Sequence, residues 1–171
     1  ELPNGKMKSR EGTVVDADDL MDEMVLTAKG VSEELGKAHG LNEEEALRLY
    51  DMLGIGALKY FILKVDPKKT MLFDPKESID FNGNTASFIQ YTHARICSII
   101  RKAQENGISF GDKVPVTDLH PKEKLLLVNI HNWQSVLEQA AVNRSPAMIA
   151  NYIYELAKDF NNACAHMKSI M

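Results

Sequence analysis

The sequence predicts an all-α protein, a bundle of long helices preceded by a short irregular or β-like loop at the N-terminus. Three observations support this class. From Thr85 to Asn106 no Pro or Gly interrupts the chain. Ser145-Pro146 is a helix cap followed by proline at the first helical position. Elsewhere apolar residues recur mostly at helical spacing, and the β-prone segments are short.

The composition bounds the possible functions. The 171 residues are 44% hydrophobic and 26% charged, enough for one core or for a domain with an appendage. The net charge of -4 argues against a protein that coats nucleic acid indiscriminately, so any RNA contact must be local. Cys97 and Cys164 have no partners at zinc-ligand spacing and are expected to be free thiols without a metal. Without a long apolar run or a signal peptide, we expect a cytoplasmic protein.

Residues 1–15 are predicted to form a cationic loop that leads into a short β-prone piece. Gly5 and Gly12 bracket a mostly cationic segment: Lys6, Met7, Lys8, Ser9 and Arg10. Three cations, together with backbone amides that the glycines leave accessible, can bind a polyphosphate whose negative charge increases during a reaction. The P-loop pattern is absent. On its own, such a terminus is more often a solvated tail. Because the sequence starts within this loop at Glu1, we interpret it as a fragment of a longer polypeptide.

Two amphipathic helices are predicted next, over residues 16–39 and 41–65. Asn42 caps the second, and Gly54 and Gly56 inside it each cost about 1 kcal/mol relative to Ala, which indicates close backbone packing. Residues 66–81 are predicted to be a loop with at most a short extended pair. The apolar face of the first helix consists of Leu20, Met21, Met24, Val25, Ala28 and Val31.

The uninterrupted helix, capped by Asn84 or Thr85 and closed by Gly107, has two distinct faces. One is apolar and is expected to face a core: Ile89, Thr92, Ile96, Ile99, Ile100 and Ala103. The other, which we name the α-helical stripe, combines aromatic, cationic and small polar residues: Asn84, Phe88, Tyr91, Arg95, Ser98 and Lys102. This composition suits stacking on unpaired bases and holding phosphates, but on spacing alone ordinary packing is the commoner explanation.

The last third is also predicted to be helical, after a loop-like break over residues 109–120. Residues 121–143 read as two helices or one bent helix, in which Trp133 is expected to anchor the core. The helix that begins at Pro146 has an apolar face made of Ile149, Ile153, Leu156, Phe160 and Ala163.

Four segments resemble, in order, parts of the class I arginyl-tRNA synthetases. KMKSREGTVV is similar to the KMSKS loop, although Lys8 stands where the family has Ser and Ser9 where many class I enzymes have Lys. GIGALKYFILKV resembles the segment before the anticodon-binding core. NGNTASFIQYTHARICSIIRKA resembles the signature helix of the anticodon-binding domain of the DALR type, and RSPAMIANYIYELAKDFNNACAH resembles its later Tyr-containing helix.

The resemblance implies a C-terminal fragment of an enzyme that joins arginine to tRNA with ATP and Mg. It implies that the KMSKS-like residues Lys6, Lys8, Ser9 and Arg10 meet the ATP phosphates in the full-length enzyme, with Lys6 and Met7 binding the nucleotide. The fragment itself is expected to be inactive and to bind no cofactor, because the nucleotide-binding half is missing. The implied tRNA-binding residues are Tyr91, Arg95, Lys102 and, less directly, Tyr152.

The implied organisation has three parts. Residues 1–15 end the catalytic domain, residues 16–76 are connecting helices, and residues 77–171 form an anticodon-binding bundle that is incomplete at its C-terminus. We expect a monomer that binds arginine tRNA and neither DNA nor a membrane. A helical protein-interaction or dimerisation module is the alternative. A small phosphotransfer enzyme is a weaker one, because no acid or His is set beside the cations as a metal ligand or base.

Overall fold

The computed structural model of the chain describes residues 16–80, 83–108 and 119–168. These residues form helices joined by turns, without a strand, which confirms the all-α prediction. The predicted loops over 1–15 and 109–118 lie outside the described residues. Within the described ranges no helix has the length and apolar character needed to span a membrane. The helices are α1 (Ala17–Glu34), α2 (Glu43–Leu63), α3 (Pro75–Ser78), α4 (Ala86–Glu105), α5 (Pro121–His131), α6 (Trp133–Asn143) and α7 (Pro146–Lys168).

Side-chain caps fix where the main helices begin. At α2 the backbone N–H of Glu45 donates to the Asn42 side chain at 2.9 Å, and the Asn42 N–H donates back to the Glu45 carboxylate at 3.0 Å. This reciprocal pair satisfies two backbone donors that the helix cannot pair internally. At α4 the cap is Thr85, whose hydroxyl accepts from the Phe88 N–H at 3.3 Å. The sequence thus locates both starts to within one residue.

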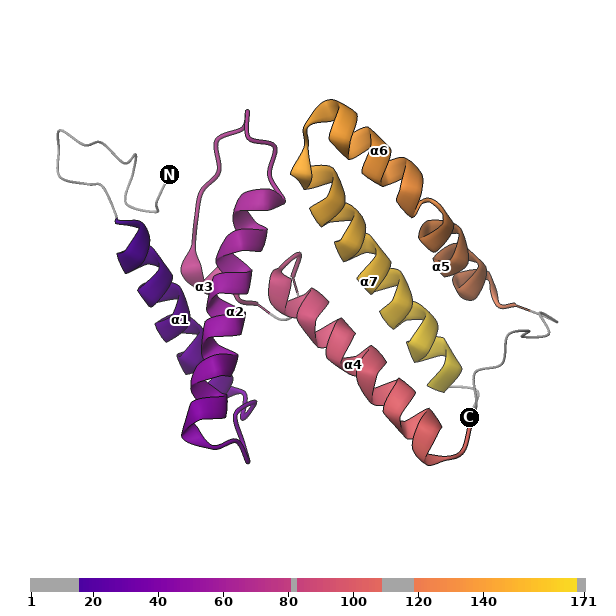
Figure 1. The fold of residues 1–171 in the computed structure, drawn as a ribbon, viewed down its shortest axis with the longest axis horizontal. Coiled ribbons are helices and arrows are strands. Elements are labelled where there is room, and N and C mark those ends of the chain that lie inside the picture. Colours follow the sequence, from indigo (N-terminus) through magenta and orange to yellow (C-terminus); the bar gives the residue numbers. More distant parts are fainter. Residues whose placement is uncertain (1–15, 81–82, 109–118, 169–171) are drawn as a thin grey trace.

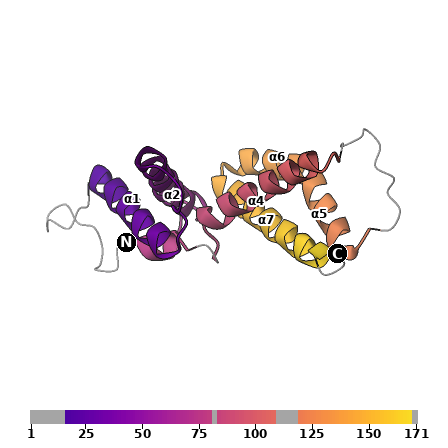
Figure 2. The same cartoon turned by 90° about the horizontal axis from the view of Figure 1, so that it is seen from below.

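The helices α1 and α2 pack backbone to backbone and, with α3, enclose the main core (Figures 1 and 2). A Cβ atom placed on Gly54 would lie 2.7 Å from the carbonyl oxygen of Met24, so only glycine fits there. The predicted close packing is confirmed at Gly54, whereas Gly56 faces the side-chain amide of Gln90 on α4. The buried members of this core are Met24, Ala28, Leu53, Ala57, Leu58, Phe73 and Ile79.

The remaining helices form a second unit around α7. This helix contacts α4 on one side and α5 and α6 on the other, and α2 joins the two units through contacts with both α4 and α7 (Figure 1). The buried residues of α4, α5, α6 and α7 in the described ranges are all small: Ala86, Ser87, Thr92, Ala140, Ala147, Ala150, Ala157, Ala163 and Cys164. Close approach of the helices therefore rests on small side chains rather than on large apolar ones.

Three expectations from the sequence are wrong in detail. The link over 66–81 contains the one-turn helix α3, because Asp74-Pro75 acts as an N-cap followed by Pro at the first helical position. Trp133 is 39% exposed rather than a core anchor, since it opens α6 where its ring packs against Tyr152 of α7. Ile99 and Ile100, expected to face a core, are exposed because no described element covers that part of α4.

One open expectation is resolved, and one predicted helix boundary is wrong. Residues 121–143 form two helices, α5 and α6, which meet at Asn132. The first predicted helix stops earlier than expected, at Glu34, and continues as turns through residue 40. The reason is Gly36, whose positive φ of 63° leaves the helical region.

Candidate nucleic-acid interface

Tyr91 is the exposed aromatic residue of the α-helical stripe. It lies in the second turn of α4 with 52% of its surface exposed, and the Nζ of Lys37 sits 5.2 Å from its ring centroid. An accessible aromatic ring beside a cation is the arrangement that stacks on an unpaired base and contacts its phosphate.

Arg95, one turn further along α4, points to α7. Its Nη1 donates to the side-chain oxygen of Asn161 at 2.7 Å, and the Nδ2 of Asn161 donates to the Thr92 hydroxyl at 2.7 Å. This chain of hydrogen bonds holds the half-buried guanidinium in one orientation at the seam between α4 and α7. Only one of its donors is used within the described residues, which leaves a planar, charged group available to a phosphate or a base edge.

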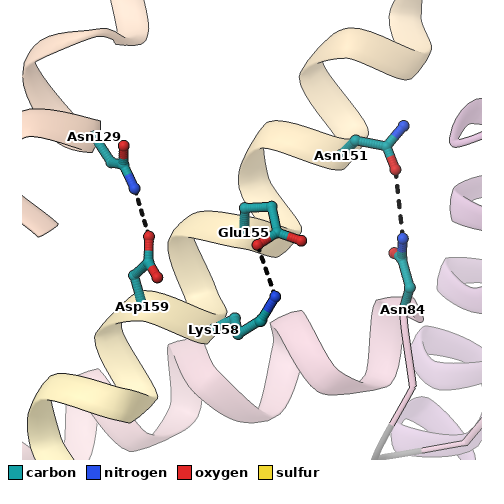
Figure 3. A network of polar contacts seen from close by, with 6 residues as sticks. All are labelled: Asn84, Asn129, Asn151, Glu155, Lys158 and Asp159. Carbon is teal, nitrogen blue, oxygen red and sulfur yellow. Dashed lines mark hydrogen bonds and ion pairs between the residues drawn. The ribbon is translucent and has the colours of Figure 1, made fainter. Parts of the chain in front are cut away.

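The α-helical stripe is therefore not a single free surface. Phe88 packs against Tyr154 of α7 with ring centroids 5.4 Å apart, and Asn84 is hydrogen-bonded to Asn151 of α7 (Figure 3). Ser98 is half-buried, so Tyr91 and Lys102 are its exposed members. Three of the six predicted stripe residues, Asn84, Phe88 and Arg95, therefore contact α7.

Tyr152 belongs to a different surface from Tyr91. Its hydroxyl donates to the backbone carbonyl of Asn129 on α5, and its ring lies 5.4 Å from that of Trp133 on α6. Partial burial raises the pKa of the Tyr152 phenol, so the hydroxyl stays a hydrogen-bond donor at neutral pH. Tyr91, by contrast, faces Lys37 and α2. The structure does not bring these two tyrosines into one pocket.

Lys102 lies exposed in the last turn of α4, roughly 16 Å from Tyr91 along the helix axis. A nucleic acid that touches both would have to follow α4 for most of its length. The KMSKS-like residues lie outside the described residues: Lys6, Met7, Lys8, Ser9 and Arg10. In the described part of the chain, no cluster of His, Cys, Asp or Glu could hold a metal ion.

A polar joint fixes the second unit to the end of α2. The Tyr60 hydroxyl lies 2.6 Å from the side-chain oxygen of Asn84 and 3.1 Å from the carbonyl of Ala150. Lys64 Nζ donates to the Asn84 carbonyl at 2.8 Å, and Asn151 Nδ2 donates to the Lys64 carbonyl at 3.0 Å. These bonds join α2, the turn before α4, and α7. They set the position of α4 relative to α1 and α2.

The joint is partly shielded from water, and this burial shifts the pKa values of its two titratable groups, Tyr60 and Lys64. Burial, with smaller effects of Tyr154 and Glu155, raises the pKa of Tyr60 to about 12. Burial also lowers the pKa of Lys64, an effect that Glu77 opposes. At neutral pH the Tyr60 phenol is therefore neutral and can donate to Asn84 or Ala150.

Sequence reasoning missed Lys37, Asn151 and Asn161. The two asparagines had a usable signal, because both are polar residues next to the apolar face of a helix, at Ile149, Ile153 and Phe160. Such residues commonly bond across a helix seam, as Asn161 does with Arg95. Lys37 had no such signal. It approaches Tyr91 only through the packing of α1, α2 and α4.

Known proteins contain segments similar to this chain. Residues 89–170, which include most of α4 and all of α5 and α6, match the DALR anticodon binding domain. The chain is 60% identical over 95% of its length to the arginine–tRNA ligase of Flavobacterium psychrophilum and 59% identical over 94% to that of Bacteroides thetaiotaomicron. Over nearly its whole length the chain is similar to one part of these arginine–tRNA ligases. It spans about a quarter of the length of these relatives, 26% and 27% respectively.

Two solved structures have a similar arrangement of helices. The arginyl-tRNA synthetase of Thermus thermophilus superposes with a TM-score of 0.79 at 26% identity, over 95% of this chain and 25% of that one. The Plasmodium falciparum enzyme shares the fold with a TM-score of 0.72 at 23% identity, over 91% of this chain and 27% of that one. The helical order from α1 to α7 therefore recurs in these two enzymes, and residues 89–170 match the DALR anticodon binding domain.

Proposed function

We propose that this chain binds the anticodon arm of an arginine tRNA as part of an enzyme that joins arginine to that tRNA. One observation carries the proposal most strongly. The helix matched to the anticodon-binding domain presents an exposed tyrosine, Tyr91, and an orientated guanidinium, Arg95. Stacking by the ring and planar hydrogen bonding by the guanidinium are how proteins hold unpaired RNA bases. Lys102 adds a phosphate contact at the far end of α4, and Tyr152, whose contacts are with α5 and α6, is a weaker candidate for a tRNA contact.

The proposal includes the division of the chain. Residues 1–15 belong to the end of a catalytic domain, residues 16–76 are connecting helices, and residues 77–171 are the anticodon-binding bundle. In the whole enzyme ATP and Mg would supply the activation of arginine. Lys6, Lys8, Ser9 and Arg10 would meet the phosphates, and Lys6 and Met7 would also contact the nucleotide. The working state is a cytoplasmic monomer that binds tRNA, and neither DNA nor a membrane.

The deciding experiment measures equilibrium binding of the chain to an arginine tRNA transcript and to the same transcript with a changed anticodon, at 50 mM and 200 mM salt. Preference for the arginine anticodon that persists at the higher salt supports base recognition, because phosphate contacts alone weaken steeply with salt. Equal binding of both transcripts would contradict it.

Two variants locate the contact. Tyr91→Ala is expected to weaken tRNA binding about 5- to 150-fold, since stacking contributes about 1–3 kcal/mol per base. Tyr91→Phe keeps the ring and is the matched control, with binding close to wild type. The melting temperature of both variants should stay near that of the wild type because the side chain is half exposed. Unfolding of Tyr91→Ala with intact binding by the folded fraction would make Tyr91 a packing residue.

The helical protein-interaction module remains the competing function, and one observation favours it. Several large apolar side chains of α5 and α6 are exposed: Leu125, Leu127, Val128, Ile130, Trp133 and Leu137. Such a patch is typical of a surface that another protein covers. Sedimentation at increasing protein concentration separates the two functions, because a dimerisation module gains mass and the proposed monomer does not.

A further inference from the structure

An open apolar cleft of about 460 Å³ lies where three helices meet, α2, α4 and α7. Its volume falls within the range of about 300–1,000 Å³ that small-molecule sites occupy. Most of the lining is aliphatic and comes from all three helices: Leu63, Ala86, Ile89, Ile149, Ala150 and Ile153. The hydrophobic effect favours an apolar group that replaces water against such a lining. The cleft is therefore a candidate site for a small molecule.

Hydrogen bonds hold the three walls of the cleft in position. Between α2 and α4, the side-chain amide of Gln90 donates to the backbone carbonyl of Met52 at 3.2 Å. Gly56 leaves room for this amide, since a Cβ atom there would lie 2.7 Å from the Gln90 nitrogen. Between α2 and α7, the Tyr60 hydroxyl lies 3.1 Å from the carbonyl of Ala150. The cleft is therefore a preformed feature of the packed helices.

Lys59 of α2 is the charged residue among the described residues that line this cleft. It is exposed, and it forms no ion pair within the described ranges. No Asp or Glu of those ranges lines the cleft, although the whole chain has a net charge of -4. Lysine side chains commonly lay their methylenes on apolar surface and keep the ammonium group in water. The mouth of the cleft therefore favours an anion.

The interior of the cleft offers little to a polar ligand. The Tyr60 hydroxyl already bonds to Asn84 or Ala150, and the Gln90 nitrogen bonds to Met52. A polar group that entered would lose its hydrogen bonds to water without replacing them. Tyr60 is also the single aromatic ring in the described lining, so a stacked ring system has little to pack on. The body of the occupant should therefore be a flexible alkyl chain.

We propose that this cleft binds a medium-chain carboxylate, its alkyl chain against the aliphatic walls and its carboxylate at the mouth beside Lys59. The inference goes beyond the proposed function and needs no RNA. Ala86, in the wall, lies about 180° around α4 from Arg95, at 100° per residue. The ligand contacts both units at once, because α2 belongs to the first and α4 and α7 to the second. It therefore stabilises their arrangement.

The first test titrates the full chain with hexanoate, octanoate, decanoate and dodecanoate, each below its micelle concentration, by calorimetry. One molecule should bind per chain. The affinity should rise about fourfold for each methylene that enters the cleft, and should level off when the cleft is full. The melting temperature should rise with ligand concentration, since the ligand binds the folded state. The absence of binding, several molecules per chain, or a gain that never levels off would overturn the proposal.

Lys59→Ala tests the position of the carboxylate. It should weaken decanoate binding about 1.5- to 5-fold, the value of an exposed ion pair, and leave the binding of decan-1-ol unchanged. Lys29→Ala is the matched control, because this lysine pairs with Glu33 at 4.0 Å and no described residue of α1 lines the cleft. It should bind decanoate like the wild type. Equal decanoate binding by the wild type and Lys59→Ala would overturn the contact with Lys59.

Leu63→Trp tests the location of the site. Leu63 lines the cleft and is exposed, so a larger side chain can occupy the cleft without disturbing the main core. Decanoate binding should weaken by about tenfold or more, while the melting temperature without ligand stays near that of the wild type. Leu47→Trp is the control on the same helix, at an exposed position outside the cleft lining, and should bind decanoate normally.

Normal decanoate binding by a folded Leu63→Trp variant would overturn the cleft as the site. If that variant does not fold, the chain-length series and Lys59→Ala still decide, because Lys59 is exposed and its truncation leaves the packing of the helices intact. These outcomes are separate from those of the tRNA experiments. Failure to bind decanoate leaves the proposed function in place, and loss of anticodon preference leaves the carboxylate site in place.

Discussion

The two halves of the molecule are stabilised in different ways. Around α1, α2 and α3 large side chains are buried, and Met24 and Ile79 have no exposed surface. In α4, α5, α6 and α7 the buried residues are small, and large apolar residues such as Leu127 and Ile130 remain half exposed. The first unit gains its stability from burying large apolar surface, whereas the second is held by close helix contacts and by polar bonds across the seams.

The second unit also keeps unfilled apolar space. An open cleft of about 220 Å³ lies between α4, α5 and α7, and one of about 460 Å³ lies between α2, α4 and α7. Apolar side chains that line an open cleft lack packing partners on one side, so they make fewer dispersion contacts than the fully buried side chains of the first core.

The largest difference should appear when one apolar side chain is removed from each unit. Met24→Ala is expected to lower the free energy of unfolding by about 2–5 kcal/mol, because it opens a cavity in a fully buried core. Ile130→Ala, on half-exposed α5, should cost about 1 kcal/mol or less. Urea denaturation of both variants checks this, and equal losses would mean that the two units are equally well packed.

A glycine pair on α1 and α2 tests the backbone contact that supports the first unit. Gly54→Ala is expected to destabilise by about 1–3 kcal/mol, since its Cβ would lie 2.7 Å from a carbonyl oxygen of α1 that cannot move independently. Gly30→Ala is the control with the opposite sign, because nothing lies within 4 Å of its Cβ, and it should stabilise by about 0.5–1 kcal/mol. Thermal melts of both variants give the sign of each change in stability. A Gly54→Ala variant with unchanged stability would contradict the close contact between α1 and α2.

These contrasts show what the sequence could predict. The caps at Asn42 and Thr85, the glycine contact at Gly54 and the order of the helices follow from local rules, because caps and helix periodicity depend on neighbouring residues. The exposure of Trp133 and Ile99 depends on which helix packs opposite them, and the local sequence pattern carries no information about that helix. For the same reason the residue types of the α-helical stripe could be read from the sequence, but not that Arg95 contacts α7 while Tyr91 lines a cleft against α2.

The polar joint between the two units should make stability depend on alkaline pH. The pKa of Tyr60 is raised to about 12 from an ordinary value of 10.0, so the stabilisation by its neutral phenol is complete below pH 10 and is lost as the pH rises through 12. At pH 8, Tyr60→Phe should cost about 1 kcal/mol through the lost hydrogen bond. At pH 11 the difference should shrink or vanish, because only the wild type has a phenol to ionise. Melting temperatures of both proteins at the two pH values check this, and a constant difference would show that the joint does not shield Tyr60.

The smallest effect is expected at the exposed end of α4, where the helix should tolerate a polar side chain. Ile99 is 45% exposed, so Ile99→Gln should change the free energy of unfolding by no more than about 0.5 kcal/mol. Ile89→Gln is the control on the same helix. Ile89 lines the open clefts between α4 and both α2 and α7, so a polar amide there should cost more. Urea denaturation at two protein concentrations gives both values and also tests for a partner chain. A large, concentration-dependent loss in Ile99→Gln would mean that a second copy covers this end of α4, and would favour the interaction module over a monomer that leaves α4 open to RNA.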